Sequence, residues 1–98
     1  MFVEVAQFKA NPGVSDEKVL VASQKVHDNY LSMCKGFVSR ELLKSEDGTW
    51  MDVVHFETFS DAKAATDNFP NNPSAKEFDS LLDVKTAKMM RFKSLKKY

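Results

Sequence analysis

The stretch FVSRELLKSEDGTWMDVVHFE, residues 37–57, has the pattern of a β-hairpin and decides the fold. Two runs rich in β-branched and aromatic residues, 37–46 and 49–57, are separated by Asp47-Gly48, a dipeptide typical of two-residue hairpin turns. We therefore predict two adjacent antiparallel strands joined by a two-residue turn.

This turn determines which residues lie opposite each other in the hairpin. It places Leu43 opposite Asp52, with Glu41 on the same face, and it places Arg40 opposite His55 on the other face. The face of Asp52 carries the bulkier aromatic side chains, so we expect helices to cover that face. The prediction depends on the turn length, because a shift of one residue moves every side chain of a strand to the opposite face.

Patterns before the hairpin predict a strand and a helix. Residues 2–9 form an apolar run that ends at a turn. Ser15 precedes two acidic residues and is the expected N-cap of a helix that ends near Gly36. The apolar stripe of this helix consists of Val19, Ala22, Val26, Tyr30 and Met33.

Patterns after the hairpin predict two short helical segments and a last strand. Ser60 is the expected N-cap of a helix that the proline-rich segment 70–73 breaks. Ser74 and Glu77 form a capping box for the next helical segment, and residues 86–92 read as a strand. The order strand, helix, strand, strand, helix, strand predicts an α+β, ferredoxin-like domain, in which a four-stranded antiparallel sheet carries its helices on one face.

Both faces of the hairpin carry large apolar side chains. One face has Phe37, Leu43, Trp50, Val54 and Phe56, and the other has Val38, Leu42, Met51 and Val53. A sheet with one face in water should alternate apolar and polar residues. The helices of one short chain cover only one face, so we expect a second copy of the chain to cover the other face in a homodimer.

Composition limits the class of protein. The 98 residues form a single expected domain, 1–98, with 43% hydrophobic and 29% charged residues. Fourteen basic residues balance fourteen acidic ones, which disfavours nucleic acid as a partner. The chain shows neither the pattern of a signal peptide nor an apolar run of about 18 residues, so we expect a cytoplasmic protein without a membrane partner.

Several motifs of the chain are similar to those of one known family. They are a glycine-aromatic pair after the first helix, the hairpin, an aromatic residue that closes the third strand, and a Ser-x-Ala segment that opens the second helix: Gly36-Phe37, Asp47-Gly48, Phe56 and Ser60-Asp61-Ala62. With these motifs the chain resembles the antibiotic-biosynthesis-monooxygenase-like (ABM-like) domains of the dimeric α+β barrel superfamily.

The resemblance implies a dimer that binds small molecules between the sheet and the helices of each subunit. Some members are cofactor-free oxygenases of phenolic or quinol-type compounds, so the implied ligand is a small apolar or phenolic molecule and no cofactor is expected. Haem-degrading members have a tryptophan where this chain has Phe56 and a histidine on the following helix, which residues 61–69 lack. A binding or structural dimer without catalytic activity is the alternative function.

His27 and Asp52 are the candidate catalytic residues. His27 lies at the edge of the apolar arc of the first helix, where a histidine is a suitable base for a phenolic proton at neutral pH. Asp52 lies on the aromatic face of the hairpin, where a carboxylate must find hydrogen-bond donors. The alternatives are a satisfied histidine at the core boundary and an aspartate that reaches solvent at a strand end.

Three further residues are candidates for substrate binding. Trp50 and Phe56 would form the walls of a cavity bordered by His27 and Asp52, and Glu41 would share that face. Trp50 has the alternative of being an ordinary core residue, since large aromatic residues dominate small cores.

Other reactive residues form no recognisable site. Arg40 and His55 are expected to pair on the face of the dimer partner, as a structural or a functional polar patch. The two histidines and Cys34 do not have the spacing of common zinc ligands, so no metal site is predicted. RNA-recognition domains share the element order, but the segment 47–52 has acidic residues where their third strand has basic ones.

Overall fold

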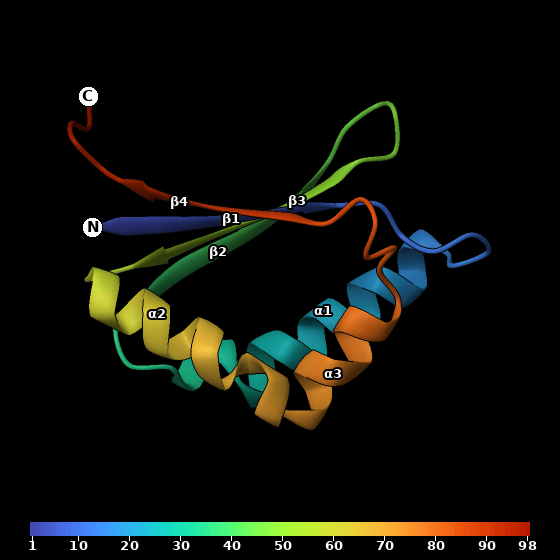
Figure 1. The fold of residues 1–98 in the computed structure, drawn as a ribbon, viewed down its shortest axis with the longest axis horizontal. Coiled ribbons are helices and arrows are strands. Elements are labelled where there is room, and N and C mark those ends of the chain that lie inside the picture. The colour runs from blue at the N-terminus through green and yellow to red at the C-terminus, as the bar shows by residue number, and fades with distance from the viewer.

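The computed structural model describes all 98 residues as one layer of sheet packed on one layer of helices (Figure 1). Its elements are β1 (Phe2–Phe8), α1 (Asp16–Asn29), the 3₁₀ turn η1 (Leu31–Met33), β2 (Phe37–Lys44), β3 (Trp50–Phe56), α2 (Phe59–Asn68), the 3₁₀ turn η2 (Phe69–Asn71), α3 (Pro73–Ser80) and β4 (Lys88–Lys93). The strands are antiparallel in the order β2-β3-β1-β4. The predicted ferredoxin-like α+β architecture is confirmed.

The first helix begins as predicted and ends early. The side-chain oxygen of Ser15 accepts a hydrogen bond from the backbone N–H of Lys18, so Ser15 is the N-cap. The backbone leaves the helical region at Tyr30, and Met33, predicted to be in the apolar stripe, is exposed. Gly36 therefore does not cap α1. A glycine is required there because its φ is +77° and because a Cβ atom would collide with the side chain of Asp61.

The later helices use different N-caps from those predicted. Thr58, in extended conformation, accepts a hydrogen bond from the backbone N–H of Asp61, so the N-cap of α2 lies two residues before the predicted cap, Ser60. The side-chain oxygen of Asn72 accepts bonds from the backbone N–H groups of Ser74 and Ala75, so α3 begins before Ser74. Proline follows Asn72 at the first helical position, where its missing N–H is not needed.

The hairpin is confirmed, but its predicted register is wrong by one residue. The backbone N–H of Ser45 donates to the carbonyl of Thr49, and that of Gly48 donates to the carbonyl of Ser45. Gly48 has φ +90°, so the loop is the three-residue type that ends in a left-handed glycine. As a result Leu42, and not Leu43, lies opposite Asp52.

The register shift reverses the faces of β2. Arg40 lies opposite Val54 and faces the helices, whereas Glu41 lies opposite Val53 on the uncovered face. An irregularity between Phe37 and Ser39 adds one residue to β2 and returns Phe37 to the helix side, where its ring contacts Phe56. Only the central part of β2 is therefore reversed relative to the prediction.

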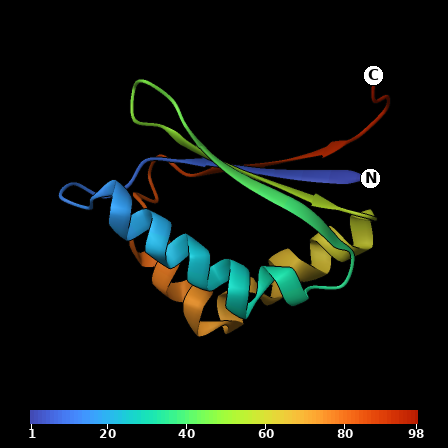
Figure 2. The ribbon, with the colours of Figure 1, turned by 180° about the vertical axis from the view of Figure 1, so that it is seen from behind.

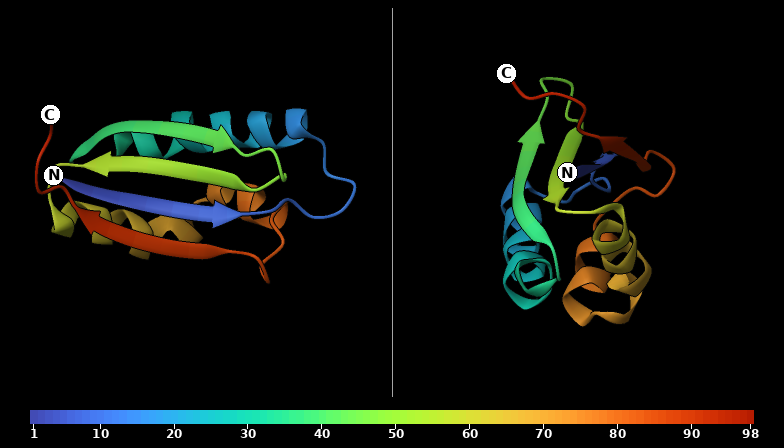
Figure 3. Two further views of the ribbon diagram at one scale, coloured as in Figure 1. Left: turned by 90° about the horizontal axis from the view of Figure 1, so that it is seen from above. Right: turned by 90° about the vertical axis from the view of Figure 1, so that its left-hand side faces the viewer.

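The helices cover one face of the sheet and leave the other bare. In the left view of Figure 3 the four strands lie side by side with the helices behind them, and Figure 2 shows α1 running below β2 and β3. The bare face carries apolar side chains from all four strands: Val3, Val5, Leu43, Met51, Val53, Met90 and Phe92. No helix of the structure has the length and apolar composition that crossing a membrane requires.

Candidate functional site

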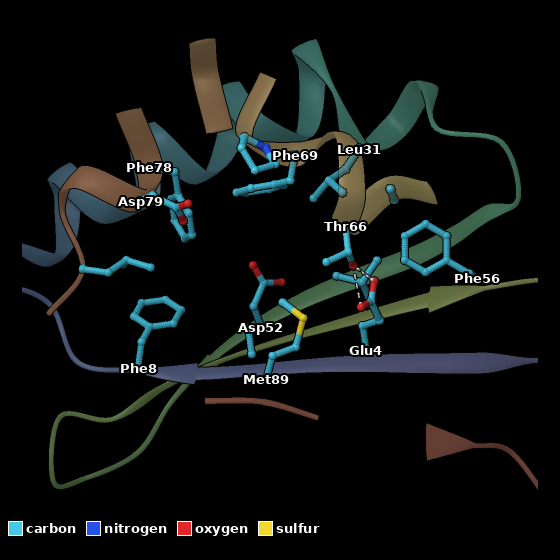
Figure 4. A pocket seen from close by; sticks show the side chains of 15 residues that line it. Glu4, Phe8, Leu31, Asp52, Phe56, Thr66, Phe69, Phe78, Asp79 and Met89 are labelled. Carbon is cyan, nitrogen blue, oxygen red and sulfur yellow. Dashed lines mark hydrogen bonds between the residues drawn. The ribbon is translucent and has the colours of Figure 1, made fainter. Parts of the chain in front are cut away.

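A cavity of about 280 Å³ lies between the covered face of the sheet and the segment formed by α2, η2 and α3 (Figure 4). It separates two clusters of core residues, one around Phe8, Val26 and Phe78 and one around Phe56 and Ala62. Protein interiors are normally packed without voids of this size, and a small domain usually has one contiguous core. The cavity is therefore the candidate site.

Ten of the fifteen lining residues are hydrophobic, and aromatic rings form much of the wall. Phe8, on β1, meets the ring of Phe78, on α3, edge to face at 5.7 Å, and Phe78 is buried. Phe69, the first residue of η2, lies edge to face with Tyr30 at 5.8 Å. The hydroxyl of Tyr30 donates to the carbonyl of Ala65, and burial raises its pKa well above the usual value, so it stays protonated. These contacts hold the rings in place.

Asp52 lies on the sheet floor of the cavity and is paired with Arg40. The guanidinium donates from Nε and Nη2 to the two carboxylate oxygens, at 2.8 and 2.7 Å, and from Nη1 to the carbonyl of Ser23 at 2.9 Å. The side chains of Arg40 and Asp52 are 6% and 10% exposed, so this ion pair is buried. Both oxygens are held by one rigid donor, which keeps the carboxylate fixed in direction.

Glu4, on β1, is a second buried acid at the cavity. The hydroxyl of Thr66, on α2, lies 2.9 and 2.7 Å from its two carboxylate oxygens, and Arg91 Nε, on β4, donates to Oε2 at 2.9 Å. Glu4 is 7% exposed, and the Arg91 side chain is 32% exposed at the edge of the sheet. This network connects α2, β1 and β4 next to the cavity.

Asp79, on α3, is the third acid of the lining and differs from the other two. Its side chain has neither an ion-pair partner nor a hydrogen-bond donor in the structure. Partial burial raises its pKa from the usual value, and the residue is in part exposed at the rim. Asp79 is therefore the one carboxylate of the cavity that is free to bind a ligand.

The structure brings some of the predicted site residues together. Asp52 and Phe56 both line the cavity, as the predicted strand parity of β3 requires. Trp50 is buried and stacks on Phe8, its partner on β1, at 6.4 Å, but it does not line the cavity. Trp50 is thus placed as a core residue.

His27 does not border this cavity. It lies in a separate shallow groove between α1 and β2, together with Ser23, Gln24 and Arg40, and its ring is 5.7 Å from that of Phe37. Arg40 contributes to that groove while its guanidinium holds Asp52, which faces the cavity. The predicted common cavity for His27 and Asp52 is therefore absent from the structure.

The corrected register accounts for the other misplaced residues. Glu41 is exposed on the bare face of the sheet, so its predicted position beside Asp52 is wrong. Arg40 and His55 were expected on one face, but Arg40 faces the helices and His55, opposite Val3, faces away from them. Both errors follow from a hairpin loop one residue longer than expected.

Sequence reasoning missed Glu4, Thr66 and Asp79. Thr66 and Asp79 lie on helix faces where polar residues are ordinary, so no local pattern marks them. Glu4 could have been recognised, because the other residues on its face of the strand, Phe2, Ala6 and Phe8, are apolar. No three side chains of histidine, cysteine or acidic residues come together as ligands for a metal ion.

Several solved structures are similar to this one. SnoaB, a cofactor-independent oxygenase from Streptomyces nogalater, aligns with a TM-score of 0.79 at 14% identity, over 98% of this chain and 94% of that chain. An antibiotic biosynthesis monooxygenase aligns with a TM-score of 0.75 at 8% identity, over 98% of this chain and all of the other. A conserved protein from Methanosarcina mazei Go1 aligns with a TM-score of 0.72 at 9% identity, over 96% and 92% of the two chains.

Comparisons of the sequence, unlike those of the structure, find no match. No protein-family model matches the chain, and no curated protein matches it. At identities of 8 to 14%, the structural similarity establishes a shared fold only, so the chemistry of this chain must be inferred from its own residues. The chain has the four-stranded ferredoxin-like α+β fold of the antibiotic-biosynthesis-monooxygenase structures.

Proposed function

We propose that the protein binds a small, largely apolar aromatic molecule with hydroxyl groups in the cavity between sheet and helices. The observation that carries this proposal is an apolar, aromatic-walled cavity that also presents carboxylate oxygens, which accept hydrogen bonds from hydroxyl groups. Its volume of about 280 Å³ lies just below the usual range for ligand sites, about 300–1,000 Å³. This size favours one or two fused rings.

The proposed reaction is cofactor-independent oxygenation of a phenolic or quinol-type compound. In such a reaction the phenol reacts as its keto tautomer, whose activated ring CH₂ group and O₂ yield a carbonyl group and water, so that the substrate is oxidised and O₂ is reduced. The protein would bind the substrate, exclude water with its aromatic wall and accept a proton. Of the two candidate bases, Asp52 lines the cavity and His27 lies outside it, which favours Asp52.

Binding without turnover is the second candidate function. It is favoured by the state of the two buried acids, because Arg40 and Arg91 already hold Asp52 and Glu4. The donors of these arginines occupy oxygens of the two carboxylates that would otherwise be open to a ligand proton. Asp79 is then the only acid of the cavity available to take a proton, and it lies at the rim.

We further propose that two copies of the chain associate through the bare face of the sheet. The support is the row of apolar side chains there, which no element of the chain covers. Exposed apolar patches of this kind are typical of protein interfaces. The cavity lies on the opposite face of the sheet, so each subunit of the dimer keeps its own site.

The two candidate functions are separated by measuring ligand binding and oxygen consumption in parallel. 1-Naphthol and naphthohydroquinone, which have two fused rings, are the probes, with calorimetry for binding and an oxygen electrode for turnover. Ala65→Phe fills the cavity from α2, and Ala64→Phe, on the exposed side of the same helix, is the matched control. Circular dichroism verifies that both variants fold.

Oxygen uptake above the rate of spontaneous oxidation, abolished by Ala65→Phe and retained by Ala64→Phe, would establish the oxygenase. Binding with the same pattern of variants but without uptake would establish the non-catalytic alternative. Equal behaviour of the two variants, or no binding of either probe, would contradict the proposed site.

A further inference from the structure

The charged residues that line the cavity are all acidic. Three of the lining residues are acidic, Glu4, Asp52 and Asp79, and none is lysine, arginine or histidine. The two arginines nearby neutralise Asp52 and Glu4 through direct hydrogen bonds. No guanidinium or ammonium group of the lining is left to meet a negatively charged ligand.

The carboxylate of Asp79, at the rim of the cavity, has no cationic partner. Its carboxylate has no partner, and the rings of Phe69 and Phe78 line the same cavity (Figure 4). A carboxylate or phosphate on a ligand would enter an apolar space beside like charge, which costs free energy through both desolvation and repulsion. A protonated amine would meet opposite charge and aromatic rings, both of which stabilise a cation.

We propose that the ligand is a hydroxylated aromatic amine whose ammonium group binds Asp79 and whose ring lies against Phe69 and Phe78, and that the cavity excludes aromatic carboxylates. This inference rests on the proposed function, because it names the ligand class of the same cavity. Asp79 is the residue that determines the charge preference, whereas Asp52 and Glu4 remain bound to their arginines.

A series of naphthalene derivatives with different charges tests the inference. Naphthylmethylamine, naphthylmethanol and naphthoate present the same rings with a cationic, neutral or anionic substituent, and calorimetry at neutral pH gives their dissociation constants. We expect the amine to bind about tenfold more tightly than the alcohol, and naphthoate to bind at least about tenfold more weakly than the alcohol.

Two variants of α3 assign the preference to a residue. Asp79→Asn should bring the affinity for the amine to that for the alcohol and leave the alcohol unchanged. Glu77→Gln is the matched control, since it makes the same change in charge on the same helix but lies outside the cavity lining, where Glu77 pairs with Lys25. It should retain the preference for the amine.

The outcomes distinguish this inference from the proposed function. Naphthoate binding as tightly as the amine would overturn the charge preference while leaving an occupied cavity. An unchanged affinity of Asp79→Asn for the amine would overturn the role of Asp79. Failure of all three probes to bind would instead overturn the proposed function.

Discussion

The buried ion pair between Arg40 and Asp52 makes a prediction about stability. Arg40→Met removes the charge and the three hydrogen bonds of the guanidinium but keeps a long apolar side chain in its place. Asp52, whose side chain is only 10% exposed, is left with two unpaired oxygens. The variant should therefore be much less stable than the unmodified protein.

The size of the effect follows from the geometry. Breaking a buried ion pair by removing one partner costs roughly 3–5 kcal/mol, because the remaining charge is buried without compensation. A domain of this size has a free energy of unfolding of about 5–15 kcal/mol, so the loss is a large part of the total. Replacing both residues, in Arg40→Met with Asp52→Leu, should restore most of the loss, since no unpaired charge remains.

Urea unfolding followed by circular dichroism gives the free energies, at one fixed protein concentration so that association contributes equally to each variant. The control is Lys63→Met, which breaks an exposed ion pair with Asp67 and should cost less than about 1 kcal/mol. A cost for Arg40→Met no larger than that of the control would refute the reasoning, as would a double variant less stable than Arg40→Met alone.

Three other predictions concern assembly, pH and backbone conformation. Light scattering should give a mass of about 22 kDa, twice the 11.1 kDa of the chain, and Val53→Asp on the bare face should reduce it to that of one chain; a single-chain mass for the unmodified protein would exclude the dimer. Because the pKa of Tyr30 is raised in the folded protein, its contribution to the free energy of unfolding is complete below pH about 10, the pKa of tyrosine in the unfolded chain, and falls above that pH as the unfolded chain ionises. In urea titrations at alkaline pH, Tyr30→Phe should therefore lose less stability than the unmodified protein. Gly36→Ala should destabilise by at least about 1 kcal/mol more than Gly13→Ala in the same assay, because both positions have positive φ but only Gly36 has Asp61 in the space of the new methyl group; equal costs would disprove a steric role.

The hairpin shows how far the sequence could determine the fold. Asp47-Gly48 and the flanking apolar runs located both strands within two residues of their observed bounds. They did not determine the loop length, because Gly48 can occupy a left-handed position in either a two-residue or a three-residue loop. That single ambiguity moved Arg40 and Glu41 to the wrong faces.

The helices show a similar limit. Their existence was predictable from apolar spacing and from the breaking prolines, but their first residues depended on a choice between neighbouring polar side chains. Thr58 and Asn72 cap the helices, although Ser60 and Ser74 carry equally suitable oxygens. Only the tertiary packing of each helix decides between such candidates.

The cavity could not be predicted as a whole because its residues are far apart in the chain. Glu4, Thr66 and Arg91 meet only after β1, α2 and β4 have packed together. The parity of β3 did predict that Asp52 and Phe56 share a face, since side chains alternate along a strand. When a site is built from residues far apart in the chain, the sequence predicts only those parts of it that lie on one strand or helix.

The stacking of Trp50 on Phe8 has an optical consequence. The chain has a single tryptophan, and its indole stacks on the ring of Phe8, which lines the cavity. The emission of the protein at tryptophan wavelengths therefore comes from one chromophore one ring away from the site. A molecule that enters the cavity can alter that emission, so ligand binding can be followed by intrinsic tryptophan fluorescence without a label.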